Sequence, residues 1–411
     1  MAIQPSIISK KKKILILVSH GGGGHKTAGE SLKEILGTDY HIEINPVIED
    51  ILGSMDYLNQ LTRGHFTGED LYNFLLQRHQ KKLLEWMLKY GSYHMRPKRI
   101  EKTFEKYLLK TGEKPDLIIS PTPYINYGVA CAASRWDIPF LILPTDLDGS
   151  TFMLGFPEQG YPHHFKVGLA YDDPELQKTT LRNCAIRPDQ MVVTGFPVRP
   201  ACLKRYTAHD LLNIRAKHHL FEAHQTVSLM MGAMGGNLIF EHFKSLSIFD
   251  PRAHQIHLQI NICTGHNQQI ETKIHRYLSH QGARSIREGT WILPTGLVIH
   301  VRPFTEDIIE LMAASNIIIT KTGSCTVNES IYLGKKLLLD NTKKSTARFL
   351  WWEQFNIPFV QKYGLGCAFS DSKQLLMLIP SLLKYPEKKE CTLHLPNFRD
   401  NIINTVREMI R

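Results

Sequence analysis

A histidine at the end of a run of glycines is the first feature that could do chemistry. The stretch His20-Gly-Gly-Gly-Gly-His25-Lys-Thr27 follows a short apolar run at residues 14–18. A P-loop needs Gly directly before its Lys-Thr pair, where His25 stands, and no frame through these glycines gives G-x-G-x-x-G. The remaining interpretation is a loop whose backbone amides approach a ligand and whose histidine takes a proton near neutral pH. The alternative is a tight turn with an incidental histidine.

Two further glycine turns follow apolar runs later in the chain. Residues 227–231 precede a turn with Gly232, Gly235 and Gly236, and residues 317–319 precede Thr320-Lys-Thr-Gly-Ser-Cys-Thr326. The second turn comes directly before a predicted helix, whose N-terminus suits a phosphate, and Glu329 lies about one turn inside that helix. The second turn therefore predicts a phosphate site.

Alternating strand-like and helical patterns must position these loops. Residues 14–18, 117–119 and 140–143 read as strands, and residues 26–36 and 127–135 read as helices. The alternation predicts a parallel sheet with right-handed crossovers, in which ligands bind at the carboxyl edge. The pattern restarts near residue 227 and continues through three more apolar runs at 256–262, 317–319 and 337–339. We therefore predict an α/β protein of two Rossmann-like lobes, with a linker near residues 195–205.

Length and composition limit the function classes. A chain of 411 residues with 43% hydrophobic and 21% charged residues fits two ordinary folded domains. The net charge of +10 favours an anionic partner. The seven cysteines are scattered singly, which indicates a reducing compartment and suggests no zinc site. Because no apolar run reaches about 18 residues, we expect a cytoplasmic protein whose membrane association is peripheral.

The segment from residue 70 to residue 106 breaks the α/β rhythm. Leucine and aromatic residues alternate there with nine lysines and arginines, which indicates basic amphipathic helices. The segment could dock on an anionic membrane, or it could be a helical hairpin that packs on the first lobe. We expect no nucleic-acid partner, because no base-stacking motif is present. The candidate docking residues are Lys81, Lys82, Trp86, Arg96, Lys98 and Arg99.

The glycine-rich loop resembles a motif of a known family. Val18-Ser-His-Gly-Gly-Gly-Gly-His-Lys-Thr-Ala28 is similar to the corresponding stretch of the diacylglycerol glycosyltransferases, the monogalactosyldiacylglycerol synthase family. Six more stretches match in order: Pro115-Asp-Leu-Ile-Ile-Ser120, Pro144-Thr-Asp146, Val192-Val-Thr-Gly-Phe-Pro-Val198, Met231-Gly-Ala-Met-Gly-Gly236, Cys263-Thr-Gly-His-Asn267, and Ile318-Ile-Thr-Lys-Thr-Gly323 with Glu329. The resemblance thus covers nearly the whole chain.

This resemblance implies an architecture and an activity. The expected fold is GT-B, two Rossmann-like domains facing each other across a cleft. Its domains would be residues 1–200 on the acceptor and membrane side, 201–375 for the nucleotide-sugar, and 376–411 as C-terminal helices packing back toward the first domain. The implied reaction is inverting transfer of a hexose from a UDP-sugar to a lipid hydroxyl such as that of diacylglycerol. We expect no metal and no cofactor, and a location at the inner face of the cell membrane.

The resemblance also implies residue roles. His25 would be the base on the acceptor hydroxyl, and Asp146 could orient it. Glu329 would bind the ribose hydroxyls. Glu353 and Asn356 would contact the sugar hydroxyls. The other implied site residues are Gly22, Gly23 and Gly24 on the acceptor side and Gly232, Gly235, Gly236, Asn267, Lys321, Thr322, Gly323, Ser324 and Thr326 on the donor side.

The chain departs from the family pattern in ways that leave the donor sugar open. Gly323-Ser-Cys-Thr326 replaces Gly-Pro-Gly-Thr, and residues 341–352 replace Pro-Gly-Gln with a longer segment that carries Lys343, Lys344, Arg348, Trp351 and Trp352. Asp146-Leu-Asp148 resembles a metal-binding D-x-D, but its place after a first-lobe strand favours a structural or acceptor-side role. Two alternatives stay open: a lipid-intermediate N-acetylglucosaminyltransferase of cell-wall synthesis, whose loop usually carries Gly-Gly-Ser/Thr, and a catalytically silent GT-B binding protein.

Overall fold

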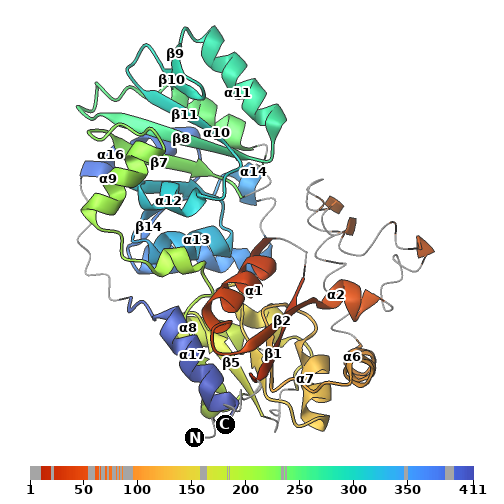
Figure 1. Cartoon of the computed structure of the whole chain (residues 1–411). Helices are drawn as coiled ribbons and strands as arrows, with labels where there is room; N and C mark the ends of the chain where they lie inside the picture. The colour runs from red at the N-terminus through yellow and green to blue at the C-terminus, as the bar shows by residue number, and fades with distance from the viewer. Residues whose placement is uncertain are drawn as a thin grey trace, which may run out of the picture. The chain divides into compact units, whose positions relative to one another are not determined.

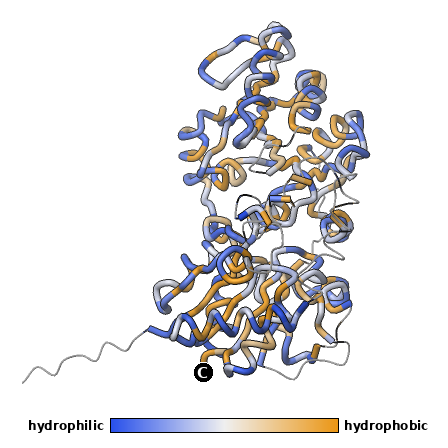
Figure 2. The backbone as a smooth tube through the Cα atoms, turned by 90° about the vertical axis from the view of Figure 1, so that its right-hand side faces the viewer, coloured by the Kyte–Doolittle hydropathy of each residue, from blue (hydrophilic) through white to orange (hydrophobic). Residues whose placement is uncertain are grey.

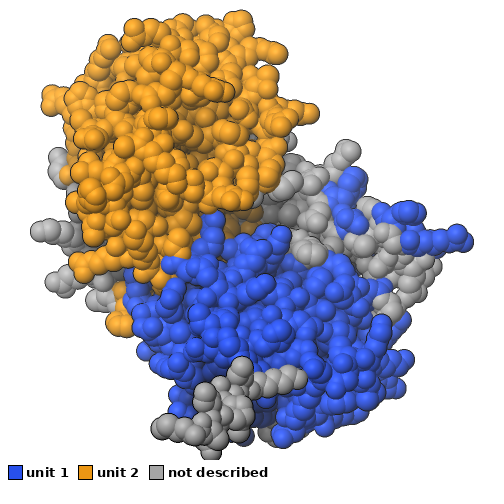
Figure 3. All heavy atoms as spheres, viewed as in Figure 1, with its two compact units in different colours: residues 1–200, 395–411 blue, residues 201–394 orange. Residues whose placement is uncertain are grey.

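The chain folds into two compact units. Unit 1 comprises residues 1–200 and 395–411, and unit 2 comprises residues 201–394 (Figure 3). The structure is a computed structural model. It describes residues 11–19, 23–53, 61–63, 65, 70–71, 74–75, 80, 83, 86, 96–157, 164–182, 184, 186–232, 236, 238–346, 350–384 and 393–411.

Unit 1 is built on a six-stranded sheet in the order β2-β1-β3-β4-β5-β6. All five strand pairs are parallel. Strands β1, β3 and β4 are mostly apolar, as expected of parallel strands that are buried on both faces of the sheet. Figure 2 shows hydrophobic segments in the interior of this unit. The strands are β1 (Lys13–Val18), β2 (His41–Pro46), β3 (Leu117–Ser120), β4 (Phe140–Ile142), β5 (Phe165–Leu169) and β6 (Met191–Val193).

Helices pack on the sheet of unit 1 (Figure 1). One core cluster joins β1, β3 and β4 to α6 and α7, with Phe104 and Val129 fully buried in it. Helix α17 returns from the far end of the chain and packs beside α1. The helices and 3₁₀ turns are α1 (Gly23–Leu36), α2 (Val47–Asp50), α6 (Pro97–Thr111), α7 (Asn126–Arg135), η2 (Gly149–Met153), α8 (Pro174–Thr180), η3 (Pro188–Gln190) and α17 (Phe398–Met409).

Unit 2 contains an eight-stranded sheet in the order β14-β13-β12-β7-β8-β11-β10-β9. The pairs from β14 to β11 are parallel, and the hairpin β9–β10 adds an antiparallel edge. The strands are β7 (Gln225–Met230), β8 (Leu258–Gly265), β9 (Arg284–Arg287), β10 (Thr290–Ile292), β11 (Val298–Pro303), β12 (Ile317–Thr320), β13 (Lys336–Asp340) and β14 (Gly366–Phe369).

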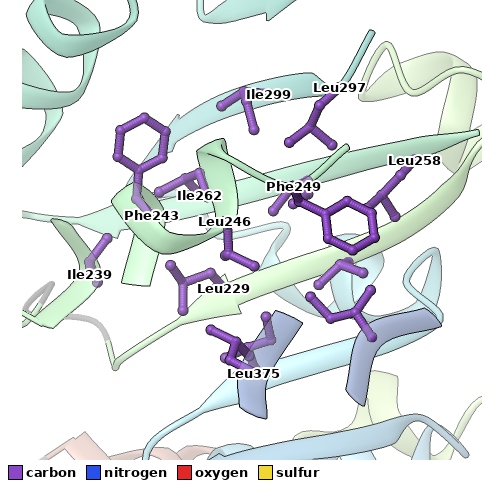
Figure 4. Packing of buried hydrophobic residues seen from close by; sticks show 14 of the residues in the cluster. Leu229, Ile239, Phe243, Leu246, Phe249, Leu258, Ile262, Leu297, Ile299 and Leu375 are labelled. Carbon is purple, nitrogen blue, oxygen red and sulfur yellow. The ribbon is translucent and has the colours of Figure 1, made fainter. Parts of the chain in front are cut away.

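Unit 2 has its own apolar core. Phe243 and Leu246 of α10 pack with Leu229, Ile262 and Leu375, drawn from two strands and from α16 (Figure 4). A smaller cluster joins α9 to α12. The helices and 3₁₀ turns are η4 (Pro200–Leu203), α9 (Ala208–Lys217), α10 (Leu238–Ser247), α11 (Gln268–His280), α12 (Ile308–Ala313), α13 (Ser324–Tyr332), α14 (Lys343–Thr346), η5 (Trp351–Phe355), α15 (Asn356–Lys362) and α16 (Ser372–Lys384).

The C-terminal helices differ from the expected third segment. We expected residues 376–411 to pack together toward the first domain, but α16 spans the expected boundary at residue 375 and belongs to unit 2. Leu375, Ile379 and Leu382 of α16 lie in the core of unit 2. Of these two helices only α17 joins unit 1, where the Asn401 amide donates a hydrogen bond to the carbonyl of Val193, the last residue of β6.

Candidate active site

His25 lies in the first turn of α1, the helix that follows the first strand. Helix α1 packs unusually close to β1, because a Cβ on Gly29 would lie only 2.5 Å from Val18 Cγ1. Only glycine fits there without a shift of the Val18 side chain, so α1 lies close against the carboxyl end of β1. Of the expected acceptor-side glycines, Gly23 and Gly24 begin α1, and Gly22 lies outside the described residues.

The order of the sheet brings two partners to the His25 ring. Strands β3 and β4 lie next to one another and β3 lies next to β1, so their carboxyl ends share one edge. Pro121 follows β3 directly, and its carbonyl oxygen is 2.7 Å from His25 Nδ1. Thr145 follows β4, and its hydroxyl oxygen is 3.0 Å from the same nitrogen.

These contacts fix the tautomer of His25. A carbonyl oxygen only accepts hydrogen bonds, so Nδ1 carries the proton and donates it to Pro121. In the neutral ring, Nε2 therefore holds the free electron pair. This arrangement suits a general base that receives a proton at Nε2.

Burial controls the charge of His25. It lowers the pKa of the imidazole to about 4, against the hydrogen bond to the Pro121 carbonyl, which raises it. The fully buried Phe152 ring lies edge-on at 6.4 Å between centroids. The Phe152 carbonyl in turn accepts a hydrogen bond from the buried Asn126 amide. A pKa below the usual value favours the neutral form of His25 at neutral pH.

The orienting role expected for Asp146 stays a prediction. The contacts that orient Nδ1 come from Thr145, the residue before it, and from Pro121, which is a backbone partner that residue types do not reveal. Asp148, the second carboxylate of the D-x-D-like stretch, is buried and accepts a hydrogen bond from the Ser150 amide at the start of η2. Its role in the fold is that of a cap.

In unit 2 the expected donor residues come from four adjacent strands. The order β13-β12-β7-β8 places the segments after these strands along one carboxyl edge. Gly232 follows β7, Lys321 follows β12, and Asn267 follows β8. Gly232 has φ +88°, a backbone conformation that favours glycine. Gly235 lies outside the described residues, and Gly236 lies just before α10.

Several expected donor residues support the local backbone. Asn356 is fully buried, and its amide nitrogen donates to the Thr322 carbonyl and to the Ser324 hydroxyl at 3.2 Å. Through this nitrogen it braces the turn before α13, and its expected contact with the sugar stays a prediction. Asn267 caps α11 by accepting a hydrogen bond from the Ile270 amide.

The turn after β12 also contains buried polar oxygens. Thr320 Oγ1, Thr322 Oγ1 and Asn356 Oδ1 have no hydrogen-bond partner among the described residues. Glu329, in the second turn of α13, is only 3% exposed, and Thr326 is half-buried. Buried polar atoms are stable when they find partners, so this turn suits a ligand rich in hydroxyl and phosphate groups.

The segment that departs from the family pattern is tied to α10. The buried His242 ring of α10 contacts Asp340 at the end of β13, with 2.7 Å between Nε2 and Oδ2. Burial raises the pKa of Asp340, but hydrogen bonds from His242 and Thr342 outweigh it and leave that pKa below its usual value. Glu241 pairs with Lys344 at 2.8 Å on the surface. The sequence alone did not single out His242 or Asp340.

A group of potential metal ligands lies at another place in unit 2. The ligand atoms of three residues lie within 4.8 Å of one another: His218, Asp307 and Glu310. The described parts of the chain contain this one group of three or more potential metal ligands. Lys217 already pairs with both carboxylates, at 3.0 Å and 2.8 Å. This cluster joins α9 to α12 as an ion-pair network.

The family comparison concerns unit 2. Residues 232–344 match the glycosyltransferase family 28 C-terminal domain. The matched residues all lie within unit 2. The match includes the glycine turns at Gly232 and Gly323, and it ends within α14, before the Trp351–Trp352 pair.

Relatives cover nearly the full length of the chain. A probable chloroplastic monogalactosyldiacylglycerol synthase 3 of Oryza sativa subsp. japonica is 23% identical and covers 98% of this chain and 75% of its own length. A processive diacylglycerol beta-glucosyltransferase of Bacillus thuringiensis is also 23% identical and covers 97% of this chain and 94% of its own. The resemblance inferred from the sequence motifs is confirmed.

Solved structures confirm the GT-B fold. MurG of Acinetobacter baumannii superposes with a TM-score of 0.56 at 15% identity, over 97% of this chain and 99% of that one. A UDP-GlcNAc 2-epimerase of Neisseria meningitidis, bound to UDP-GlcNAc, gives 0.55 at 14% identity over 96% and 100%. One neighbour is an epimerase, so at this identity the likeness shows the fold and does not choose the reaction.

Proposed function

We propose that the protein transfers a hexose from a UDP-sugar to a lipid hydroxyl, with diacylglycerol as the acceptor and inversion at the anomeric carbon. The observation that supports this most is the His25 ring, held by Pro121 and Thr145 so that Nε2 is free to take a proton. Its place at the first strand-to-helix loop of unit 1 agrees with this role. The two relatives named above are diacylglycerol glycosyltransferases by name.

In the proposed reaction, the acceptor hydroxyl attacks the anomeric carbon while Nε2 of His25 takes its proton. The bond between that carbon and the diphosphate oxygen breaks, and UDP leaves with the electron pair. One attack from the opposite face inverts the centre, so no sugar–enzyme bond forms. A base that acts in a positioned complex contributes roughly 10²–10⁴-fold to the rate.

Donor binding is assigned to the glycine turns of unit 2. The diphosphate would lie against Gly232, Gly236 and the N-terminus of α13, with Lys321 as a cation. Glu329 would accept hydrogen bonds from the ribose hydroxyls after a small opening of its buried site. We propose that these groups balance the charge of the departing UDP without a bound metal ion and that no cofactor takes part.

A peripheral position at the cytoplasmic face of the membrane would bring the acceptor to His25. The described residues between positions 61 and 86 include four exposed apolar side chains, Leu61, Phe74, Leu83 and Trp86. Arg96, Lys98 and Arg99 are exposed at the start of α6, whereas Lys81 and Lys82 lie outside the described residues. No helix in the described part of the chain is long and apolar enough to cross a membrane. Apolar side chains next to basic ones are typical of reversible binding to an anionic surface.

Mass spectrometry of the products would test the function. The full chain is incubated with UDP-glucose, UDP-galactose or UDP-N-acetylglucosamine and with anionic vesicles that contain diacylglycerol. We expect glycosyl-diacylglycerol from at least one donor, and at least about a hundredfold less of it from the His25→Ala variant in the same time. Donor binding without any transferred or released sugar would instead identify a silent binding protein. A parallel incubation supplies a polyprenyl diphosphate-linked sugar as the acceptor, and transfer to that acceptor alone would identify the cell-wall alternative.

A further inference from the structure

The side chain of Lys321 runs between the two glycine turns of unit 2. A Cβ on Gly323 would lie 3.2 Å from Lys321 Cε and 3.7 Å from Nζ, and a Cβ on Gly232 would lie 3.9 Å from Cε. Gly232 follows β7 and Gly323 follows the adjacent strand β12. One flexible cation thus serves both turns, and the absence of two side chains leaves its stem room to move.

Lys321 is loosely paired with a carboxylate of the same edge. Its Nζ lies 3.8 Å from Glu353 Oε1, which is longer than a hydrogen bond, and the Lys321 side chain is 48% exposed. The other oxygen of Glu353 accepts a hydrogen bond from the Leu350 amide at 3.2 Å, which holds the carboxylate at the start of η5. The carboxylate is therefore fixed while the ammonium can leave it.

We propose that Lys321 exchanges partners when the donor binds, leaving Glu353 for the diphosphate and thereby freeing Glu353 for the hydroxyls of the sugar. This inference rests on the proposed function, because it assumes a nucleoside diphosphate-sugar at the glycine turns. A diphosphate carries more charge than one carboxylate, so the ammonium moves to it. The freed Glu353 oxygen then accepts a hydrogen bond from a sugar hydroxyl. Binding of the diphosphate and recognition of the sugar are coupled through this one ion pair.

The exchange of partners makes a prediction about the binding of UDP without its sugar. Independent contacts of Lys321 and Glu353 with the donor would not make this prediction. Glu353 competes with UDP for Lys321, so Glu353→Gln should bind UDP about two- to fivefold more tightly, as expected when a partly exposed pair is removed. The amide oxygen of Gln can still accept from Leu350, so η5 keeps its cap. Lys321→Met, which keeps most of the stem, should bind UDP about tenfold or more weakly because a charge-assisted contact is lost. Lys321→Arg should stay near the parent.

Calorimetric titration of UDP into the parent, both single variants and the double variant tests the exchange. We expect Glu353→Gln to raise the UDP affinity more in the parent than in the Lys321→Met background. We also expect it to lower the affinity ratio of UDP-sugar to UDP, because the sugar loses its acceptor. UMP, which lacks the second phosphate, should respond little to either substitution.

Three results would overturn the inference in distinguishable ways. An equal or larger gain in the Lys321→Met background would mean that Glu353 only repels the diphosphate. A weaker UDP affinity in Glu353→Gln would mean that Glu353 itself supports nucleotide binding. Either result leaves the proposed function intact. A parent protein that binds neither UDP nor any UDP-sugar would overturn the proposed function and the exchange together.

Discussion

The His25 ring is held by neutral groups, and this sets its chemistry. A carboxylate partner would favour the imidazolium and raise the pKa of the ring, whereas the Pro121 carbonyl and the Thr145 hydroxyl orient it without adding a charge. The ring therefore stays neutral at the cost of basic strength. A general base is most effective when its pKa lies near the operating pH, so the low pKa of His25 limits the driving force for taking the proton of the hydroxyl.

Substitution of His25 gives the first prediction. His25→Ala should lower kcat by roughly two to four orders of magnitude, because the general base is lost. The affinity for UDP should stay nearly unchanged, because His25 lies in unit 1 and the donor turns lie in unit 2. His25→Gln is the sharper variant, since it keeps hydrogen bonding without basicity. Steady-state kinetics with calorimetry separates the two effects, and near-normal turnover would remove His25 from the mechanism.

The depressed pKa of His25 gives a pH dependence with a definite sign. Because the folded-state pKa is about 4 and the unfolded value is about 6.5, the unfolded chain binds the proton more tightly. The contribution of His25 to stability is therefore complete above about pH 6.5 and is lost as the pH falls from there toward 4. The neutral base also persists through that range.

The pH profile of kcat/KM for a short-chain soluble acceptor measures this effect. We expect the acidic limb caused by His25 to lie well below pH 6, since this profile reports the free enzyme. NMR titration of the His25 ring should give a pKa that agrees with the midpoint of this acidic limb. A midpoint near 6.5 by both methods would contradict the burial of the ring described above.

Sequence reasoning found His25 but not its partners. A histidine beside four glycines is visible in the chain, and the strand before it places the loop at a ligand-binding edge. Thr145 and Pro121 are 120 and 96 residues away, and only the sheet order β1-β3-β4 brings them together. The neighbouring carboxylate, Asp146, is the more familiar partner for a base, so residue type directed attention to Asp146 and not to Thr145.

At the scale of elements, helix α10 links a glycine turn to the segment after β13. The helix begins at Leu238, just after the turn at Gly232, and it contacts that segment by a buried pair and by an exposed pair. The buried His242 also packs edge-on against the Phe369 ring of β14. This helix therefore helps to fix the spacing between the glycine turn at Gly232 and the end of β13, where the segment that departs from the family pattern begins.

The two pairs on α10 give a matched stability test. His242→Leu should destabilise the protein by about 3–5 kcal/mol, because it leaves Asp340 buried without its partner. Glu241→Gln should cost only about 0.2–1 kcal/mol, because the Glu241–Lys344 pair is exposed to solvent. Urea unfolding of both variants measures the difference. Equal small losses would show that the buried pair contributes little to the stability of unit 2.

The sequence pattern could not predict that the two C-terminal helices pack in different units. Helices α16 and α17 both show apolar residues at helical spacing, which predicts that each packs on a sheet. The pattern does not tell which sheet. Ile379 packs in unit 2 and Ile402 is buried in unit 1, although about 20 residues separate them.

For the whole molecule, the central prediction concerns the membrane. Replacing Lys81, Lys82, Arg96, Lys98 and Arg99 with Gln should release the protein from acidic vesicles and depress its activity on them. Each basic residue near an anionic surface contributes about 1 kcal/mol, so five together decide the binding. Activity on a soluble short-chain acceptor should be kept, because the His25 loop is untouched.

Vesicle co-sedimentation at low and high salt is the measurement. A control variant removes the same charge from unit 2 by replacing Arg276, Arg284, Arg287, Lys373 and Lys384, all exposed, with Gln. It should still sediment at low salt. If both variants sediment like the parent, or if the parent does not sediment with acidic vesicles even at low salt, the docking surface is not the 70–106 segment.

The sequence anticipated the two α/β lobes because long apolar runs and glycine turns carry strong signals. Strands β1, β3, β7 and β12 lie within a few residues of their expected bounds. Strand β2 was missed because its residues, His41–Pro46, are mixed polar and apolar at an edge of the sheet. The hairpin β9–β10 was missed for the same reason, since β9 carries two arginines on a mostly exposed edge.

The return of α17 to unit 1 has a consequence for how the protein is made. Residues 201–394 are synthesised between β6 and α17, so translation completes unit 2 before the last helix of unit 1 exists. At about 5–20 residues per second the ribosome needs roughly ten to forty seconds for that stretch. In the folded protein Phe398, Ile402 and Val406 of α17 are buried. Until α17 has been made, the part of unit 1 that later packs against these three side chains is exposed to solvent. The nascent chain therefore exposes an apolar surface of unit 1 until α17 has been made. We expect chaperones that bind nascent chains to bind this surface during that time.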